Sequence, residues 1–163
     1  MTSAEQIVEL LKTKKLRISA AESCTGGMFI SKLIDVPGTS EVIGASYITY
    51  SDNAKIETVG VNPGTIEKFG VVSENTAFEM AVGAARTAKA DIGVGITGFA
   101  GPFADDNTHD AGKVCFGFSV NGKTLTSTKV FGNIGRNAVR ELSCIYAIDT
   151  LIKLIRSFGD KNG

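Results

Sequence analysis

One stretch near the N-terminus most constrains the fold, because it predicts a strand that turns at once into a helix. Residues 16–20 alternate apolar and polar side chains, as a short strand does, and residues 28–34 have a helical pattern. The turn between them carries Ser23, Cys24 and Thr25, followed by two glycines. Such a turn lifts a small nucleophilic side chain to the end of a sheet, where the helix start favours negative charge. The turn therefore fits either a site for acyl or phosphoryl chemistry or an ordinary turn in which Ser or Thr caps the helix.

The rest of the chain alternates helical and strand patterns. We expect strands over residues 16–20, 41–50, 91–97, 113–120 and 124–131. We expect helices over residues 3–14, 28–34, 52–59, 63–70, 73–89 and 135–158. Asn121-Gly122 joins two of the strands as a hairpin, whereas the others are separated by crossover helices. This order predicts a single α/β domain over residues 1–163, with three layers (α/β/α), a mixed sheet and a frayed tail at 159–163.

Two finer expectations concern helix ends and faces. Ser3 and Gln6 have the spacing of a capping box at the start of the first helix. In the last helix, apolar residues at helical spacing predict the buried face. That face comprises Ala138, Leu142, Ile145, Ile148, Ile152 and Ile155.

Charge and cysteine content narrow the class of partner. Lys plus Arg (17) equals Asp plus Glu (17), which argues against broad electrostatic binding of nucleic acid. No apolar run approaches the roughly 20 residues of a membrane helix, and the N-terminus lacks the pattern of a signal peptide. The three cysteines show neither a disulfide framework nor metal-ligand spacing. We expect a cytoplasmic protein that acts on a small molecule and binds neither nucleic acid nor membrane.

Lys55 lies in the opening turns of the helix that Ser51 caps. The helix dipole disfavours a cation there and lowers the pKa of the ammonium group, and a dry cleft would act in the same direction. A lysine meant to be neutral and basic is therefore well placed. The alternative is a solvated lysine paired with Asp52 or Glu57.

Arg136 and Arg140 share one face at the start of the last helix, where they repel each other and oppose the helix dipole. A bound anion would remove both penalties, and arginine suits phosphate. The alternative is that each forms a tertiary salt bridge. The glycine loop after the strand at 91–97 is a second candidate, because α/β sheets bind ligands at such ends.

Asp105, Asp106, His109 and Asp110 invite a metal site, but their polar surroundings fit a solvated loop better, so we expect no metal. His109 is the only histidine, and nothing places it near Ser23. If Ser23 is a nucleophile, we therefore expect its base to be a lysine.

Five ordered segments of the chain together resemble the CinA C-terminal domain family. The match is colinear and covers nearly the whole chain, at the length of the stand-alone members. The segments are Glu22-Ser23-Cys24-Thr25-Gly26-Gly27, Thr49-Tyr50-Ser51-x-x-Ala54-Lys55, Gly70-Val71-Val72-Ser73-Glu74, Thr97-Gly98-x-Ala100-Gly101-Pro102 and Gly135-Arg136-x-x-Val139-Arg140.

The resemblance implies a nicotinamide-nucleotide amidase, a Ser/Lys amidohydrolase that converts nicotinamide mononucleotide to nicotinate mononucleotide and ammonia. It implies Ser23 as nucleophile, Lys55 as general base and Tyr50 as a helper in the proton network. It implies no metal or cofactor, and we expect a homodimer. The remaining implied substrate-binding positions are Thr25, Gly26 and Gly27 (oxyanion), Thr97, Gly98 and Gly101 (cleft), and Arg136 and Arg140 (phosphate).

This sequence departs from the family pattern in three places. Asp52-Asn53 stands where Asn-Glu is usual, Asn137 replaces an acid, and the loop at 103–113 is atypical. Two alternatives to the amidase stay open: a non-catalytic nucleotide-binding module of the same fold, and a thiol hydrolase that uses Cys24.

Overall fold

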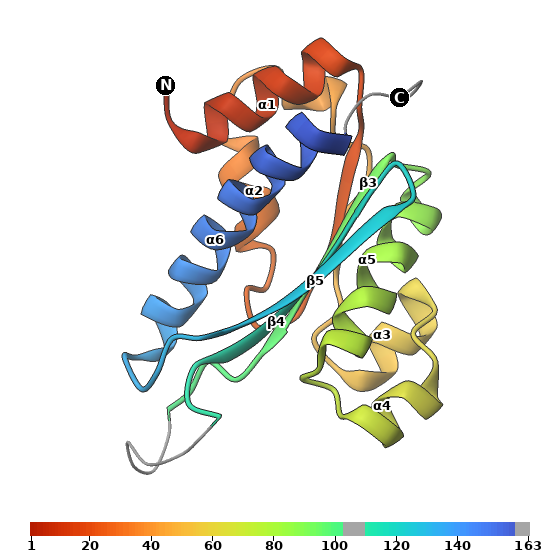
Figure 1. Ribbon diagram of the computed structural model, residues 1–163, viewed down its shortest axis with the longest axis vertical. Helices are drawn as coiled ribbons and strands as arrows, with labels where there is room; N and C mark the ends of the chain where they lie inside the picture. Colours follow the sequence, from red (N-terminus) through yellow and green to blue (C-terminus); the bar gives the residue numbers. More distant parts are fainter. Residues whose placement is uncertain (103–109, 159–163) are drawn as a thin grey trace.

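The sheet has five strands in the order β2-β1-β3-β4-β5 (Figure 1). The computed structural model describes residues 1–102 and 110–158. β1 runs parallel to β2 and β3, whereas β4 is antiparallel to β3 and β5, so the sheet is mixed, as predicted. The strands are β1 (Ile18–Glu22), β2 (Tyr47–Ile48), β3 (Ile92–Gly98), β4 (Lys113–Val120) and β5 (Lys123–Val130).

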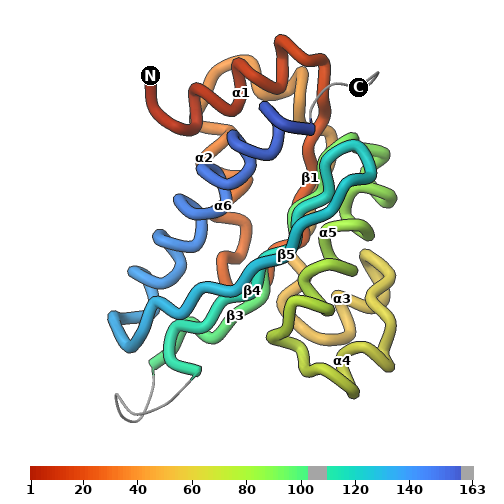
Figure 2. The backbone as a smooth tube through the Cα atoms, in the orientation of Figure 1, coloured from red at the N-terminus to blue at the C-terminus, as the bar shows by residue number. Residues whose placement is uncertain are grey.

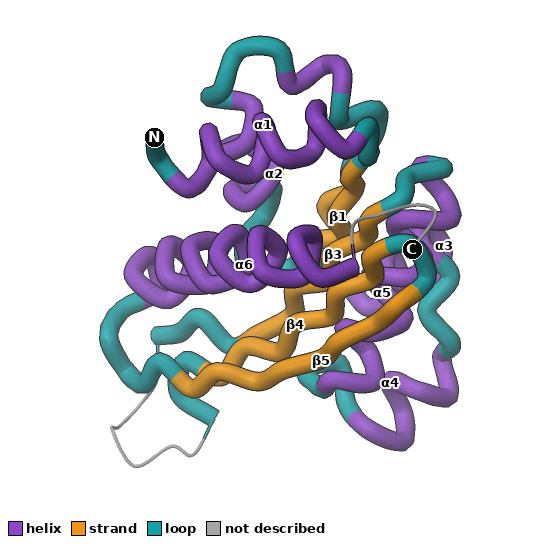
Figure 3. Tube along the Cα trace, turned by 45° about the horizontal axis from the view of Figure 1, so that its top comes forward, coloured by secondary structure: helices purple, strands orange, loops and turns teal. Residues whose placement is uncertain are grey.

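Helices cover both faces of this sheet and complete the predicted α/β/α architecture (Figures 1 and 2). One face carries α1 (Ser3–Lys14), α2 (Met28–Ile34) and α6 (Arg136–Phe158), and Figure 3 shows α6 crossing the strands. The other face carries α3 (Asp52–Val59), α4 (Pro63–Phe69) and α5 (Glu74–Ala88). None of the described helices is long and apolar enough to cross a membrane.

The larger part of the core lies between the sheet and the layer of α1, α2 and α6. Its aromatic centre comes from β4, where Phe116 and Phe118 are fully buried and Phe116 packs against Tyr146 of α6, with ring centroids 4.7 Å apart. Phe29 and Leu33 of α2 join the same cluster. This packing fixes α2, and with it the turn that carries Ser23.

On the opposite face, glycines replace side chains so that α5 lies directly on the strands. A Cβ atom at Gly95 of β3 or at Gly117 of β4 would collide with the carbonyl oxygen of Ala77, and one at Gly93 with that of Ala81. Close backbone approach of this kind requires glycine. β3 and β4 are thereby held directly against the first half of α5.

Of the strand expected over residues 41–50, only β2 (Tyr47–Ile48) forms. A short 3-10 helix (Thr39–Glu41) and an irregular segment take the place of the rest, and β2 has only two residues. The reason is local: the Ser46 hydroxyl accepts from the backbone N–H of Ala20 at 3.0 Å and donates to its carbonyl oxygen at 3.0 Å. A side chain thus takes the place of backbone pairing along β1.

Smaller corrections concern element ends and faces. The first strand begins at Ile18 and is buried on both sides rather than alternating, as expected of a parallel strand between two helical layers. The capping box is formed by Thr2 and Glu5, one residue earlier than expected. In α6, Leu142 and Ile145 are exposed, because the first half of the helix turns smaller side chains inward. These are Val139, Ser143, Cys144 and Ala147; Ala138 is exposed, and Ile148, Ile152 and Ile155 are buried as expected.

Candidate active site

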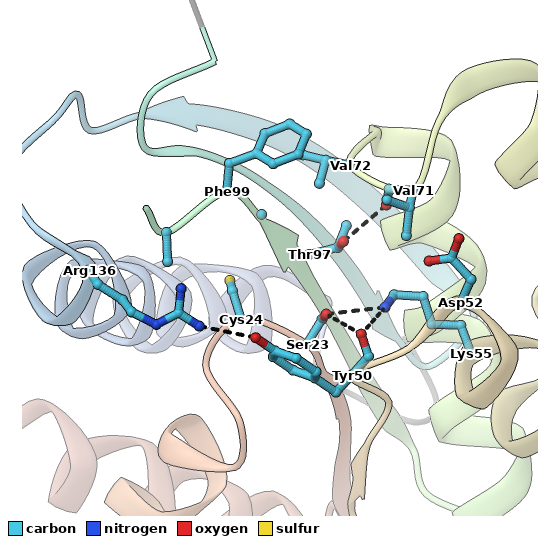
Figure 4. Close-up of a pocket in the computed structure, with 12 residues that line it drawn as sticks. Ser23, Cys24, Tyr50, Asp52, Lys55, Val71, Val72, Thr97, Phe99 and Arg136 are labelled. Carbon is cyan, nitrogen blue, oxygen red and sulfur yellow. Dashed lines mark hydrogen bonds between the residues drawn. The ribbon is translucent and has the colours of Figure 1, made fainter. Parts of the chain in front are cut away.

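Ser23 lies at the carboxyl ends of the parallel strands, on a cavity of about 240 Å³. Its backbone N–H donates to the carbonyl oxygen of Ile96 at 3.0 Å, which continues the pairing of β1 with β3. The fold thus places the hydroxyl beyond the carboxyl ends of the parallel strands, where α/β proteins bind ligands. The polar side chains that line the cavity belong to Ser23, Tyr50, Asp52, Lys55, Thr97 and Arg136 (Figure 4).

Lys55 reaches the same cavity from α3, the short helix that Ser51 caps by accepting from the backbone N–H of Ala54. Its side chain is only 1% exposed. The Nζ atom lies 3.1 Å from the Ser23 hydroxyl oxygen, and it donates to the carbonyl oxygens of Thr49 at 2.8 Å and Tyr50 at 3.3 Å (Figure 4). Two residues 32 positions apart in the chain therefore meet through a direct hydrogen bond.

Burial lowers the pKa of Lys55, while the negative charge of Asp52 raises it to a smaller extent. Within the described part of the chain, no carboxylate forms an ion pair with Lys55. The alternative of a solvated lysine paired with Asp52 or Glu57 is therefore wrong. A neutral amine here keeps two N–H groups on the two carbonyl oxygens and has its lone pair free to accept the proton of Ser23.

Cys24 also lines the cavity, beside Ser23. Burial raises the pKa of its thiol to about 11, so the group is protonated at neutral pH. A thiolate is the nucleophilic form of cysteine, and this environment disfavours it. The geometry and the acidity both favour the hydroxyl of Ser23 over the thiol.

The start of α2, directly after the turn, binds the side chain of Glu22, for which the sequence analysis predicted no role. The carboxylate of Glu22, 1% exposed, accepts from the backbone N–H groups of Phe29 at 2.9 Å and Ile30 at 3.2 Å. Burial raises the pKa of Glu22, against the opposing effect of these hydrogen bonds. Since the start of α2 already binds the chain's own carboxylate, it is not open to a ligand anion.

The expected oxyanion positions lie outside the cavity. Thr25 is fully buried, and the backbone N–H of Gly26 already donates to the carbonyl oxygen of Ser23 at 3.0 Å. Gly26 and Gly27 line a different pocket, next to Ile48. The geometry therefore does not support these N–H groups as the ones that face the reacting carbonyl.

The two arginines separate into different surroundings. Arg136 lines the cavity and donates to the carbonyl oxygen of Gly101 at 2.6 Å and to the Tyr50 hydroxyl at 3.0 Å. Arg140 does not line it; its guanidinium donates to the carbonyl oxygens of Cys24 at 2.9 Å and Thr25 at 3.2 Å. Neither forms a salt bridge within the described residues, so that alternative is wrong. Of the two arginines, Arg140 therefore stabilises the turn after Ser23, and Arg136 is the one that faces the cavity.

The remaining expected positions lie around the glycine loop after β3. Thr97 and Gly98 line the cavity, and the Thr97 hydroxyl donates to the carbonyl oxygen of Val71 at 2.9 Å. Gly101 does not line it but holds Arg136. The sequence analysis did not identify the apolar wall of the cavity, although its residues lie in the segments already quoted. These are Val71, Val72 and Phe99 (Figure 4) and, in addition, Ala100.

Residues 103–109 and 159–163 lie outside the described part of the chain. The expectations about Asp105, Asp106 and His109 as possible metal ligands, and about the C-terminal tail, therefore stay predictions.

Comparison with known proteins gives the family directly. Residues 1–155 match the family model described as the CinA C-terminal domain. The chain belongs to the CinA C-terminal domain family. A CinA-like protein of Kosmotoga olearia is 45% identical over 145 residues, which cover 89% of this chain and 35% of that protein. The chain spans about a third of the length of the curated CinA relatives that it matches.

Solved structures of the CinA superfamily have the same fold. A CinA superfamily protein from Escherichia coli superposes with a TM-score of 0.88 at 33% identity, covering 93% of this chain and 88% of that one. A competence/damage inducible protein from Agrobacterium tumefaciens gives a TM-score of 0.88 at 35% identity, with 93% of each chain covered. The family expected from the five segments, and the fold expected from the order of helices and strands, are therefore confirmed.

Proposed function

We propose that this protein is a nicotinamide-nucleotide amidase that hydrolyses nicotinamide mononucleotide to nicotinate mononucleotide and ammonia. The observation that carries the proposal is the buried contact of 3.1 Å between the Ser23 hydroxyl oxygen and the Lys55 amine. Acyl transfer to serine requires a hydroxyl paired with an amine of lowered pKa. This cavity, at the carboxyl ends of the parallel strands, contains such a pair.

The proposed reaction has two halves. Neutral Lys55 accepts the Ser23 proton as the Ser23 oxygen attacks the carboxamide carbon, which gives a tetrahedral intermediate. Collapse of this intermediate breaks the C–N bond, and protonated Lys55 gives its proton to the departing amide nitrogen, which leaves as ammonia. Water then attacks the acyl-enzyme with Lys55 as base, and the carboxylate product leaves as Ser23 regains its proton.

Each end of such a substrate has a counterpart in the cavity. Val71, Val72 and Phe99 form an apolar wall suited to a planar ring. Arg136 offers a guanidinium to the phosphate. Arg140 is left out of the proposal because it does not line the cavity and its guanidinium holds the backbone of the turn.

The cysteines also suit a reducing compartment, since Cys24, Cys115 and Cys144 are buried and free. We therefore propose action in the cytoplasm. Leu142 and Ile145, exposed on α6, are candidates for the contact of a homodimer.

The test is release of ammonia from nicotinamide mononucleotide by the purified protein. Ser23→Ala should abolish release and keep nucleotide binding, whereas Cys24→Ala, the matched change one residue away, should keep turnover. If Cys24→Ala loses turnover and Ser23→Ala keeps it, the nucleophile is the Cys24 thiol. Wild-type protein that binds the nucleotide without releasing ammonia would be the non-catalytic module.

A further inference from the structure

Tyr50 contacts both the reacting pair and the guanidinium of Arg136, through different parts of the same residue. Its carbonyl oxygen accepts from the Ser23 hydroxyl at 3.4 Å and from the Lys55 amine at 3.3 Å. Its side-chain hydroxyl accepts from Arg136 at 3.0 Å. Figure 4 shows the carbonyl oxygen and the hydroxyl group, each with its contacts, at opposite ends of the residue. Tyr50 thus connects Arg136, which can bind an anion, to the Ser23–Lys55 pair, where the proposed reaction takes place.

The charge of Arg136 is not neutralised in the described part of the chain. Its two hydrogen bonds go to neutral acceptors, Gly101 and Tyr50. A guanidinium has five N–H donors, so an anion can bind to the remaining ones without breaking either contact. Anion binding would therefore fix the guanidinium while it still holds the Tyr50 hydroxyl.

The contact of the Lys55 amine with the Tyr50 carbonyl oxygen leaves room to shorten. It measures 3.3 Å, compared with 2.8 Å between the same amine and the carbonyl oxygen of Thr49. Hydrogen bonds of catalytic groups are often long without ligand and shorten when the substrate binds. The Tyr50 side chain is 62% exposed, so little packing holds it and its bond to Arg136 matters more.

We propose that Tyr50 is a positioning residue that couples an anionic group of the substrate, bound by Arg136, to the Ser23–Lys55 pair. The anion fixes Arg136, Arg136 fixes the phenol, and the Tyr50 carbonyl then holds an N–H of Lys55 so that the amine lone pair faces Ser23. The phosphate consequently raises kcat in addition to lowering KM. This inference rests on the proposed amidase activity and adds a role for the non-reacting end of the substrate.

The first experiment separates the phosphate from the reacting end. Wild-type protein is assayed with nicotinamide riboside, which lacks the phosphate, in the presence and absence of phosphite dianion at millimolar concentration. We expect phosphite to raise the kcat for the riboside on the order of tenfold, equivalent to about 1.4 kcal/mol. Sulfate at the same ionic strength is compared, and sodium chloride serves as the control for salt.

The second experiment places the coupling on the hydroxyl. Tyr50→Phe removes the contact to Arg136 and keeps both the ring and the carbonyl group. We expect phosphite activation to be lost and the ratio of nucleotide kcat to riboside kcat to fall by a similar factor. Tyr47→Phe, which removes a hydroxyl outside this cavity, is the matched control and should keep the activation.

The outcomes are distinct. Equal losses for nucleotide and riboside in Tyr50→Phe would mean that the hydroxyl acts in the chemistry itself and would overturn the coupling. A wild-type protein that hydrolyses the nucleotide with the same kcat as the riboside and ignores phosphite would overturn the coupling and leave the amidase standing. If it hydrolyses neither substrate, the proposed function fails, and the coupling fails with it.

Discussion

Replacing the proposed base offers the sharpest test of the reaction. Ser23 has two hydrogen-bond partners for its hydroxyl in the described part of the chain, the Lys55 amine and the Tyr50 carbonyl oxygen. A carbonyl oxygen cannot act as the base at neutral pH, so the other described hydrogen-bond partner of the Ser23 hydroxyl cannot replace the amine. Loss of a general base costs about 10²–10⁴-fold, and the absence of a substitute places Lys55→Met near the upper end, about 10⁴-fold in kcat. That factor corresponds to about 5.4 kcal/mol in the activation barrier.

The assay measures ammonia release between pH 5 and 10 on Lys55→Met and on Lys55→Arg, which retains a positive charge but no usable base. In the proposed reaction the neutral amine is the active form, so wild-type kcat/KM should rise with pH through the pKa of Lys55. Burial lowers that pKa, which moves the rise below the range of an ordinary lysine. Both variants should lose the rise, and nucleotide binding and circular dichroism report whether they remain folded. A folded Lys55→Met that keeps a tenth of wild-type turnover would refute the reasoning.

Two other substitutions test the surroundings of the site. Asp52→Asn removes the charge that raises the pKa of the base, so the rise of kcat/KM should move to lower pH; Glu57→Gln, the same loss of charge at an exposed position of α3, should leave it in place. An unchanged pH profile of kcat/KM in Asp52→Asn would mean that this carboxylate does not affect the pKa of Lys55. Gly95→Ala forces a Cβ against the backbone of α5 and should cost about 1–3 kcal/mol, or several degrees in Tm. Gly44→Ala is its control, because the added carbon meets only the mobile end of the Arg17 side chain; equal Tm values for the two variants would contradict the packing argument.

Local signals in the sequence predicted most of the helices. Ser51, Asn62 and Ser73 each cap the helix that was expected to start there, because capping depends on contacts within three residues. The Asn121-Gly122 hairpin was likewise correct for a local reason. The strand expected over 41–50 forms only at Tyr47–Ile48, because a contact between Ser46 and Ala20, 26 positions apart, decides the rest of that segment.

The candidate site divides along the same line. The pKa of Lys55 is lowered, as the sequence predicts, and burial is the largest cause. The two arginines looked equivalent four residues apart, yet one faces the cavity and the other binds backbone carbonyl groups 115 and 116 positions away. Glu22 belongs to the first family segment, but its role was not predicted, because no local pattern shows that a carboxylate will fold back onto the helix that follows it.

The two-residue strand β2 has a consequence for heat sensitivity. The chain passes through it, at the outer edge of the sheet, to reach the helix that carries Lys55, whereas Ser23 continues a strand that is paired on both sides. Backbone pairing is therefore weakest in the segment that brings the amine to the hydroxyl. Gentle warming should separate these two groups before the interior melts, so that enzymatic turnover disappears at a temperature where the helical signal is still intact and returns on cooling.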